Sequence, residues 1–394
     1  MPLAHPGGPV VTTMVQVRDR TPQSSGCNSL EGVTILENIP LAQYTTLGMG
    51  GPARWFIRVT SQHQLLEAVS FARARNLPIF ILGGGSNLLI SDGGFDGLVI
   101  HAVFGDYSVV DPAPQFFNPP QNPATMSVLV DAGIIWDDFV LSVCEQGISG
   151  IECLAGIPGL VGGSPIQNIG AYGQEVASSI HSVNALDFDT LAYVVLDRDA
   201  CRFAYRSSIF NTTHRNRYVV TAVEFQFDLA ATPNLSYADL ARHFSSATVP
   251  PTPLEIYHAV RAIRARKGML LVEGDSDSNS AGSFFKNPIV EQTAVARIAA
   301  ALHIASAEIP HWPAGEGRLK LPAAWLVERA GFHKGFRMGQ AGISTKHTLA
   351  LVNLGGASAS EIVGLRDAVM HRVEELFAIR LEQEPVMLGF PQPR

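Results

Sequence analysis

Hydrophobic positions along the chain follow two periods, one typical of strands and one typical of helices. The segment 51–85 begins and ends in short apolar runs, which predict two strands. Between them, apolar residues recur at helical spacing: Leu65, Leu66, Val69 and Ala72. Ser61 and Gln64 are spaced as a capping box at the start of that helix. We therefore predict a strand–helix–strand unit here, followed by another strand at 97–103.

The second half of the chain repeats both patterns. Residues 127–133 predict a strand, residues 134–147 a helix, and residues 223–229 alternate strictly, as a half-buried strand does. Two later helices have explicit start signals, a capping box with proline at Thr252–Glu255 and a second capping box at Ser358–Glu361. The polar segment 274–282 is expected to be a flexible boundary or mobile loop. The pattern as a whole predicts an α+β protein.

Composition and charge limit the classes of protein to consider. At 394 residues the chain is too long for one ordinary core, so two or three domains are expected. The formal charge of −7 is dispersed, which argues against a nucleic-acid surface. No apolar run is long enough to span a membrane. Residues 1–38 lack a secretory signal pattern and are expected to be a flexible tail.

The four cysteines lie far apart without a CxxC pattern. They indicate reduced thiols of a cytosolic protein, and they predict neither a disulfide framework nor a metal site.

The first glycine-rich loop follows a predicted strand, in the run ILGGGSNLLISD. Gly83, Gly84 and Gly85 precede Ser86 and Asn87. A dinucleotide fold of the GxGxxG type is excluded, because Leu88 stands where the third glycine is needed and a strand-like run follows. Consecutive backbone N–H groups could instead hold a phosphate, with Ser86 and Asn87 as further donors. A tight glycine turn between two strands is an equally good interpretation of this loop alone.

A second glycine-rich stretch favours the phosphate interpretation. Residues 154–176 contain six glycines and cannot form a regular helix or strand. Their side chains with hydrogen-bonding groups are Ser164, Gln167, Asn168 and Tyr172, which suit a large, flat, polar heterocycle. Two such loops together suit a dinucleotide cofactor.

The pairing of ILGGGSNLLISD with GIPGLVGGSPIQNIGAYGQEV resembles the UDP-N-acetylenolpyruvoylglucosamine reductases. Further segments that resemble this family follow in the family's order: YTTLGMGGPARWF, CRFAYRSSIF, AGSFFKNP and LEQEPVMLG. The resemblance extends from about residue 39 to residue 389. Several long motifs in the right order are more specific than any single one.

The resemblance implies a two-part FAD-binding region of the vanillyl-alcohol-oxidase (PCMH) type and a separate α+β substrate-binding domain. The implied limits are 39–104, completed by 378–394, for the first FAD subdomain, 105–268 for the second, and 269–377 for the substrate domain. The FAD is expected to be noncovalent, since residues 78–95 contain no His or Cys. The implied cofactor-binding residues are Gly83, Gly84, Gly85, Ser86, Asn87, Gly162, Gly163, Ser164, Pro165, Asn168 and Gly170.

The same resemblance implies a reaction, in which NADPH is the co-substrate and the enolpyruvyl double bond of UDP-N-acetylglucosamine enolpyruvate is reduced. Hydride comes from flavin N5 and a proton from Ser283, while Arg206 stabilises the developing enolate. Glu384 matches the family's catalytic carboxylate. Glu382 remains a rival, because Pro385 departs from the family pattern.

The implied substrate-binding residues are Tyr172, Tyr237, Arg264, Lys267, Asn287 and Lys334. Simpler roles are open for several of them. Arg264 and Lys267 lie at a helix C-terminus, where basic residues complement the helix dipole without any ligand. Tyr237 could be a packing aromatic, and His347 could be structural.

We expect a cytoplasmic monomer with small-molecule ligands and without a nucleic-acid, membrane or metal partner. Two alternatives stay open. One is another flavoprotein oxidase or dehydrogenase of the same fold, and the other is a binding protein that has lost catalysis.

Overall fold

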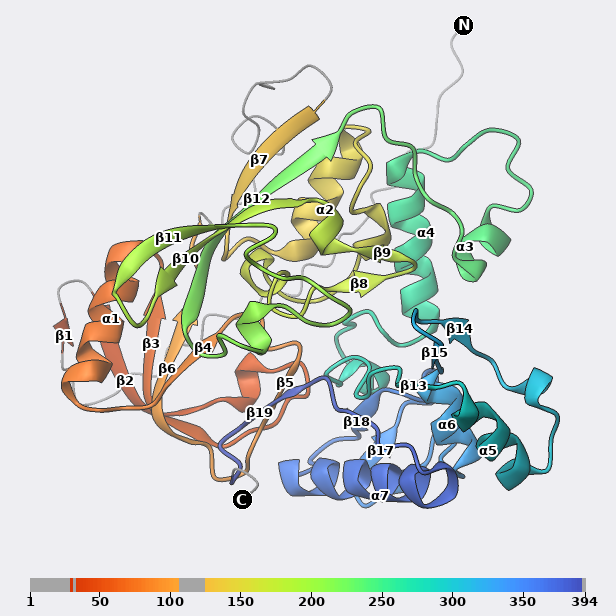
Figure 1. Cartoon of the computed structure of the whole chain (residues 1–394). Coiled ribbons are helices and arrows are strands. Elements are labelled where there is room, and N and C mark those ends of the chain that lie inside the picture. Colours follow the sequence, from red (N-terminus) through yellow and green to blue (C-terminus); the bar gives the residue numbers. More distant parts are fainter. Residues whose placement is uncertain (1–28, 31–32, 106–124, 392–394) are drawn as a thin grey trace, which may run out of the picture.

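The computed structural model describes residues 29–30, 33–105 and 125–391. Residues 1–28 and 31–32 of the expected N-terminal tail lie outside the described residues. Three regions follow one another along the chain, and the C-terminal segment returns to the first (Figure 1).

The first region is a five-stranded sheet with one helix. Its strand order is β1-β2-β3-β6-β4. The elements are β1 (Ser29–Leu30), β2 (Val33–Pro40), β3 (Pro52–Val59), α1 (Gln62–Ala74), β4 (Ile79–Leu82) and β6 (Phe95–Ala102). Strands β3 and β4 both run parallel to β6, which lies between them. The predicted strand–helix–strand unit is confirmed, and the Ser61 hydroxyl accepts a hydrogen bond from the Gln64 N–H at the start of α1.

The expected tail boundary at residue 38 is wrong at its C-terminal end. Residues 33–38 belong to β2, which pairs antiparallel with β3. Val33 and Ile35 are buried and Thr34 is exposed. This alternation is the signal of a half-buried strand, and it was obscured by the polar residues that precede it.

The second region is a four-stranded antiparallel sheet with three helices. Its order is β11-β10-β12-β7. The elements are β7 (Thr125–Asp131), α2 (Trp136–Glu145), β10 (Ile180–Asp187), β11 (Ala192–Asp197), β12 (Tyr218–Asp228), α3 (Ala238–His243) and α4 (Pro253–Arg266). Phe225 of β12 packs against Phe139 of α2, with ring centroids 4.8 Å apart. The predicted capping box at Thr252 and Glu255 is confirmed at the start of α4.

The third region has its own hydrophobic core around the long helix α7 (Ala359–Phe377). Two small three-stranded sheets and two further helices surround α7. These are β13 (Ile289–Glu291), α5 (Thr293–Leu302), β14 (Trp312–Pro313), β15 (Arg318–Lys320), α6 (Ala323–Arg329), β16 (Arg337–Met338), β17 (Ala341–Ile343) and β18 (Leu351–Asn353). One side of α7 is apolar and buried, through Ile362, Leu365, Val369 and Val373.

The C-terminal segment joins the third region back to the first. Strand β19 (Val386–Leu388) pairs in parallel with β5 (Leu88–Ile90), directly after the first glycine loop. Asp92, just beyond β5, accepts hydrogen bonds from the Ala359 and Ser360 N–H groups at the start of α7. The seam between the regions therefore contains the first glycine loop and the C-terminal strand.

Candidate active site

The two glycine-rich loops are packed directly against each other. A Cβ atom added at Gly84 would lie 2.7 Å from the Cα of Gly159. Gly85 has a φ of +61°, and a Cβ there would lie 1.8 Å from the carbonyl oxygen of Tyr44. Glycine is thus required at these positions because other backbone segments approach closely. From the sequence alone, this reason for glycine cannot be distinguished from the approach of a phosphate.

Other parts of the same loops face open space. A Cβ at Gly163 would meet no described atom within 4 Å, and one at Gly83 would meet only the Leu160 side chain, at 3.9 Å. The Ser164 hydroxyl is buried and has no hydrogen-bond partner among the described residues. Buried hydroxyls normally have partners. Exposed glycine backbone beside a buried hydroxyl that lacks a hydrogen-bond partner is suited to bind a polar cofactor. FAD is a cofactor of this kind.

The remaining predicted cofactor residues surround this junction and are more constrained. Gly162 has no room for a Cβ, which would lie 2.6 Å from the Cβ of Ala132. Pro165 and Asn168 are buried. The Asn168 amide donates to Glu175 Oε2 and to the Ala204 carbonyl, so it holds the second loop in shape.

Asn87 connects three segments of the seam. Its Nδ2 donates to Gln167 Oε1 at 2.7 Å and to the Glu384 carbonyl at 3.2 Å. Its own carbonyl accepts from the Val386 N–H at 3.0 Å. The Asn87 amide was expected to bind the cofactor. Its amide hydrogens are used instead to fix the C-terminal segment against both glycine loops.

Arg206 lies against the second loop in a strained conformation. Its φ of +53° is in the left-handed region, which arginine rarely adopts and which costs about 1–3 kcal/mol. Its Nη2 donates to the Gly170 carbonyl at 2.6 Å, and a Cβ at Gly170 would lie 2.8 Å from Arg206 Nη1. Glycine at 170 therefore makes room for the guanidinium.

Glu384 and Glu382 differ sharply in environment. Glu384 Oε1 lies 3.6 Å from Arg206 Nε, and 12% of the side chain is exposed. Glu382 is 73% exposed and pairs with Lys286. Burial raises the pKa of the Glu384 carboxyl, and the positive charges of Arg206 and Lys286 only partly oppose that shift. The geometry therefore favours Glu384 over its rival.

Ser283 is held beside the Glu384 segment by the backbone of its neighbour. The Phe284 carbonyl accepts from the Glu384 N–H at 2.9 Å, and the Phe284 N–H donates to the Leu349 carbonyl at 2.8 Å. The Ser283 hydroxyl makes no hydrogen bond within the described part of the chain. Arg206 and Glu384 are thus in contact, and Ser283 lies one residue away from a partner of Glu384.

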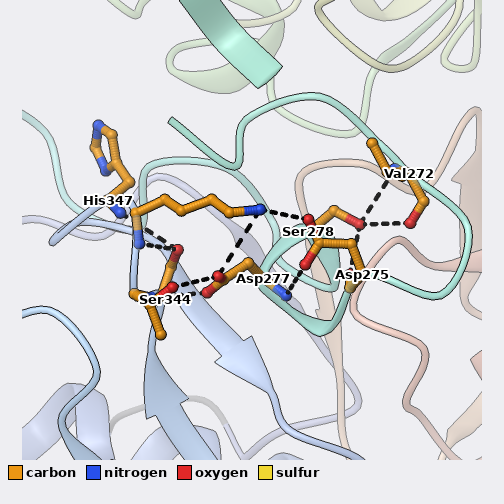
Figure 2. Close-up of polar contacts among 8 residues, drawn as sticks. Val272, Asp275, Asp277, Ser278, Ser344 and His347 are labelled. Carbon is orange, nitrogen blue, oxygen red and sulfur yellow. Dashed lines mark hydrogen bonds and ion pairs between the residues drawn. The ribbon is translucent and has the colours of Figure 1, made fainter. Parts of the chain in front are cut away.

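The loop that leads to Ser283 is tied down. The segment 272–278 and the turn 344–347 are joined by the hydrogen bonds and ion pairs of Figure 2. Lys346 Nζ lies 2.5 Å from Asp275 Oδ2, and the Thr345 N–H donates to Asp277 Oδ1 at 2.7 Å. The first part of the segment 274–282, expected to be a flexible boundary or mobile loop, is therefore anchored by partners that lie far away in the sequence.

Basic side chains gather next to that turn. Burial, followed by the charges of Lys267, Lys334 and Arg264, lowers the pKa of His347 to about 4. Its Nδ1 accepts from the Leu349 N–H at 3.1 Å. The ring points away from the Asp275–Lys346 network in Figure 2.

The basic side chains of this cluster differ in whether they already have partners in the protein. Arg264 is buried and donates to the carbonyls of Gly156 and Met269, so it also braces the second loop. Lys334 is exposed and has no ion pair among the described residues. Of these two cations, Lys334 is therefore the more available partner for an anion.

The predicted substrate tyrosines meet near Lys267. The rings of Tyr172 and Tyr237 are 5.3 Å apart, edge to face, and Lys267 Nζ lies 5.7 Å from the Tyr172 centroid. Tyr172 has a φ of +49°, so its backbone, like that of Arg206, is in the left-handed region. This arrangement brings together three of the six predicted substrate residues.

Asn287 lies elsewhere, in the wall of a separate cavity. Its Oδ1 accepts from the Ala323 N–H at 2.9 Å. The cavity, of about 520 Å³, is also lined by Tyr205 and Lys286, and neither Ser283 nor Glu384 lines it. Asn287 therefore supports the start of α6 as well as facing this cavity.

Tyr205 was missed by the sequence analysis. Lys320 Nζ lies 4.5 Å from its ring centroid, which links the second region to the third. Its position next to Arg206 in the AYRSSIF motif was the signal that could have identified it.

Comparison with known proteins identifies the family. Residues 53–190 match a model described as FAD binding domain, and residues 275–388 match the C-terminal domain of UDP-N-acetylenolpyruvoylglucosamine reductase. A reductase of that name from Thermobifida fusca is 43% identical over 357 residues, which cover 89% of this chain and 97% of the relative. The chain belongs to the UDP-N-acetylenolpyruvoylglucosamine reductase family. The enzyme of that name from Streptomyces coelicolor is 41% identical and covers 92% of each chain.

A solved UDP-N-acetylenolpyruvylglucosamine reductase, from Thermus caldophilus, has the same fold. It is 27% identical, covers 90% of this chain and 98% of its own, and superposes with a TM-score of 0.59. The expected fold class, an FAD-binding region plus a separate α+β domain, is confirmed, and so is the resemblance to this reductase family. No helix of the described ranges is long and apolar enough to cross a membrane.

Proposed function

We propose that this protein is an FAD-dependent reductase that uses NADPH to convert UDP-N-acetylglucosamine enolpyruvate to UDP-N-acetylmuramate. It would act in the cytoplasm, as a monomer, in the synthesis of peptidoglycan precursors. The observation that carries the proposal is the meeting of Arg206, Glu384 and the Ser283 segment beside two interlocked glycine loops. Family membership supports the same reaction.

We assign the FAD to the open side of the glycine loops. Gly83, Gly163 and Ser164 would hold it through bare backbone and an unsatisfied hydroxyl. When bound, FAD supplies two-electron hydride transfer. The domain limits 39–104 with 378–394, 105–268 and 269–377 belong to this proposal.

Arg206 and Glu384 would receive the substrate carboxylate. A planar guanidinium suits a carboxylate and stabilises the negative charge that develops when the adjacent double bond is reduced. A buried carboxyl with a raised pKa is more readily protonated, so Glu384 can lie next to a substrate carboxylate without charge repulsion. Arg206 is held for this task by the Gly170 carbonyl.

Ser283 would donate the proton to the carbon that bears the carboxylate. Its hydroxyl is not engaged with any other described residue, so it is available to the substrate. A serine hydroxyl is a weak acid, and only a strongly basic, enolate-like carbon can take its proton. The charge on that carbon is therefore linked to the stabilisation that Arg206 provides.

Lys267 and Lys334 would bind the diphosphate, and Tyr172 and Tyr237 would cover the nucleotide sugar. Each of the four lies around or beside the cluster at His347.

Turnover with two sugar nucleotides tests the proposal. Purified protein should oxidise NADPH in the presence of UDP-N-acetylglucosamine enolpyruvate, and mass spectrometry should show a product with two more hydrogen atoms. UDP-N-acetylglucosamine, which lacks the enolpyruvyl group, is the control and should give no such product. NADPH oxidation without reduction of the enolpyruvyl group would contradict the proposed function.

A further inference from the structure

Lys267 already has an anionic partner in the protein. Its Nζ lies 2.6 Å from Asp239 Oδ2, and the two side chains are 37% and 25% exposed. Arg242 is a weaker second partner of Asp239, at 3.7 Å, and its side chain is 80% exposed. The ammonium group assigned to a ligand phosphate is therefore paired with a carboxylate when the site holds no ligand.

Asp239 lies on an element with few anchors. Helix α3 has a single buried residue, Leu240. Tyr237, which precedes the helix, is 43% exposed and contacts the edge of Tyr172. In Figure 1, α3 lies beside α4 at the periphery, between two long connections. Segments with so few buried contacts open at low free-energy cost, so α3 can move without unfolding the domain.

Lys267 differs from the other two basic residues near His347, Lys334 and Arg264, in having a carboxylate partner. Lys334 has no ion pair within the described ranges, and the Arg264 guanidinium bonds to backbone carbonyls. Lys267 is the member of this basic cluster that is neutralised by a carboxylate. A phosphate that contacts Lys267 would lie close to the Asp239 carboxylate, and two anions at such a distance repel each other.

We propose that Asp239 is an internal competitor of the ligand's diphosphate for Lys267. This inference rests on the proposed function, because it takes Lys267 as the partner of a phosphate. Binding of a diphosphate displaces the carboxylate, and return of the carboxylate promotes release. Asp239 thereby lowers the affinity for both phosphate-bearing ligands, the nicotinamide nucleotide and the sugar nucleotide, and it prevents either from occupying the site for long.

Equilibrium binding of UDP to the FAD-loaded protein tests the inference. Asp239→Asn preserves shape but removes the competing charge. The matched control is Asp228→Asn, since Asp228 precedes the same connection and its carboxylate, among the described residues, accepts only from the Ala230 N–H. A partly exposed ion pair is worth about 0.4–1 kcal/mol, so Asp239→Asn should bind UDP about two- to fivefold more tightly, and the control should match the parent protein. Equal or weaker binding by Asp239→Asn would overturn the inference.

A second comparison isolates the ion pair. In a Lys267→Gln background, Asp239→Asn should no longer tighten UDP binding more than Asp228→Asn does, because the contested cation is absent. Persistence of the full gain in that background would show a general charge effect and would overturn the competition.

Failure of the inference and failure of the proposed function give different results. If Asp239→Asn binds UDP more tightly than the parent protein and Asp228→Asn, but the parent protein does not reduce the enolpyruvyl substrate, the inference holds and the proposed function is wrong. If the parent protein reduces the substrate, but Asp239→Asn binds UDP no more tightly than the parent does, the proposed function holds and the inference is wrong.

Discussion

The substitution Ser283→Ala separates chemistry from folding. The hydroxyl has no hydrogen-bond partner in the described part of the chain, so its removal breaks no intramolecular bond. We expect the free energy of unfolding to change by less than about 0.5 kcal/mol. Loss of a general acid typically slows the chemical step by about 10²- to 10⁴-fold, which corresponds to roughly 3–5 kcal/mol of transition-state free energy.

Anaerobic stopped-flow absorbance resolves the two half-reactions of this variant. Reduction of the flavin by NADPH should proceed at nearly the parent rate, while reoxidation by the enolpyruvyl substrate should slow by the factor above. Ser276→Ala, an exposed position on the same loop, is the matched control and should leave both rates unchanged. Equal slowing of both half-reactions by Ser283→Ala would refute the proton-donor role.

Three further predictions follow from the geometry. Glu384→Gln should lower kcat by at least about 10²-fold and Glu382→Gln by less than about threefold, because only the first carboxyl is buried at the site; similar losses in steady-state assays would contradict this. Gly84→Ala should reduce both FAD content and melting temperature, since its Cβ would lie 2.7 Å from Gly159 Cα, whereas full flavin occupancy would refute the loop contact. Asp92→Asn should cost about 1 kcal/mol of stability at pH 7, because Asp92 caps α7. Burial would raise the pKa of Asp92, but its hydrogen bonds lower it overall below 3.8, so this contribution is present above 3.8 and is lost as pH falls through the lowered value. Denaturation at pH 7 and at low pH should show the difference between the two proteins shrink in acid, and a constant difference would count against the charged cap.

Local signals explain what the sequence predicted well. The capping boxes that open α4 and α7 involve residues three positions apart, and the structure contains both. The strict alternation at 223–229 coincides with the C-terminal part of β12, which ends at Asp228. Such features are readable because their partners are neighbours in the chain. Strand β2 is the exception, because its first six residues fall in the expected tail although their alternation is equally local.

Contacts between distant segments explain what the sequence did not predict. The bonds of Asn87 to Gln167 and Glu384 span 80 and 297 positions along the chain. The left-handed backbone of Arg206 has no signature in a Tyr-Arg-Ser run. The pairing of Lys267 with Asp239 likewise depends on how α3 lies against α4. In each case, the residue type can be read from the sequence, but its partner or backbone conformation is known only from the fold.

The reductase activity itself can be measured by anaerobic stopped-flow absorbance of the unmodified protein. The purified, flavin-containing protein is reduced with NADPH and then mixed with UDP-N-acetylglucosamine enolpyruvate. We expect a rapid return of the oxidised flavin spectrum, together with formation of UDP-N-acetylmuramate. A reduced flavin that persists in the presence of this substrate would show that the protein is not this reductase, and so would a purified protein that binds no flavin.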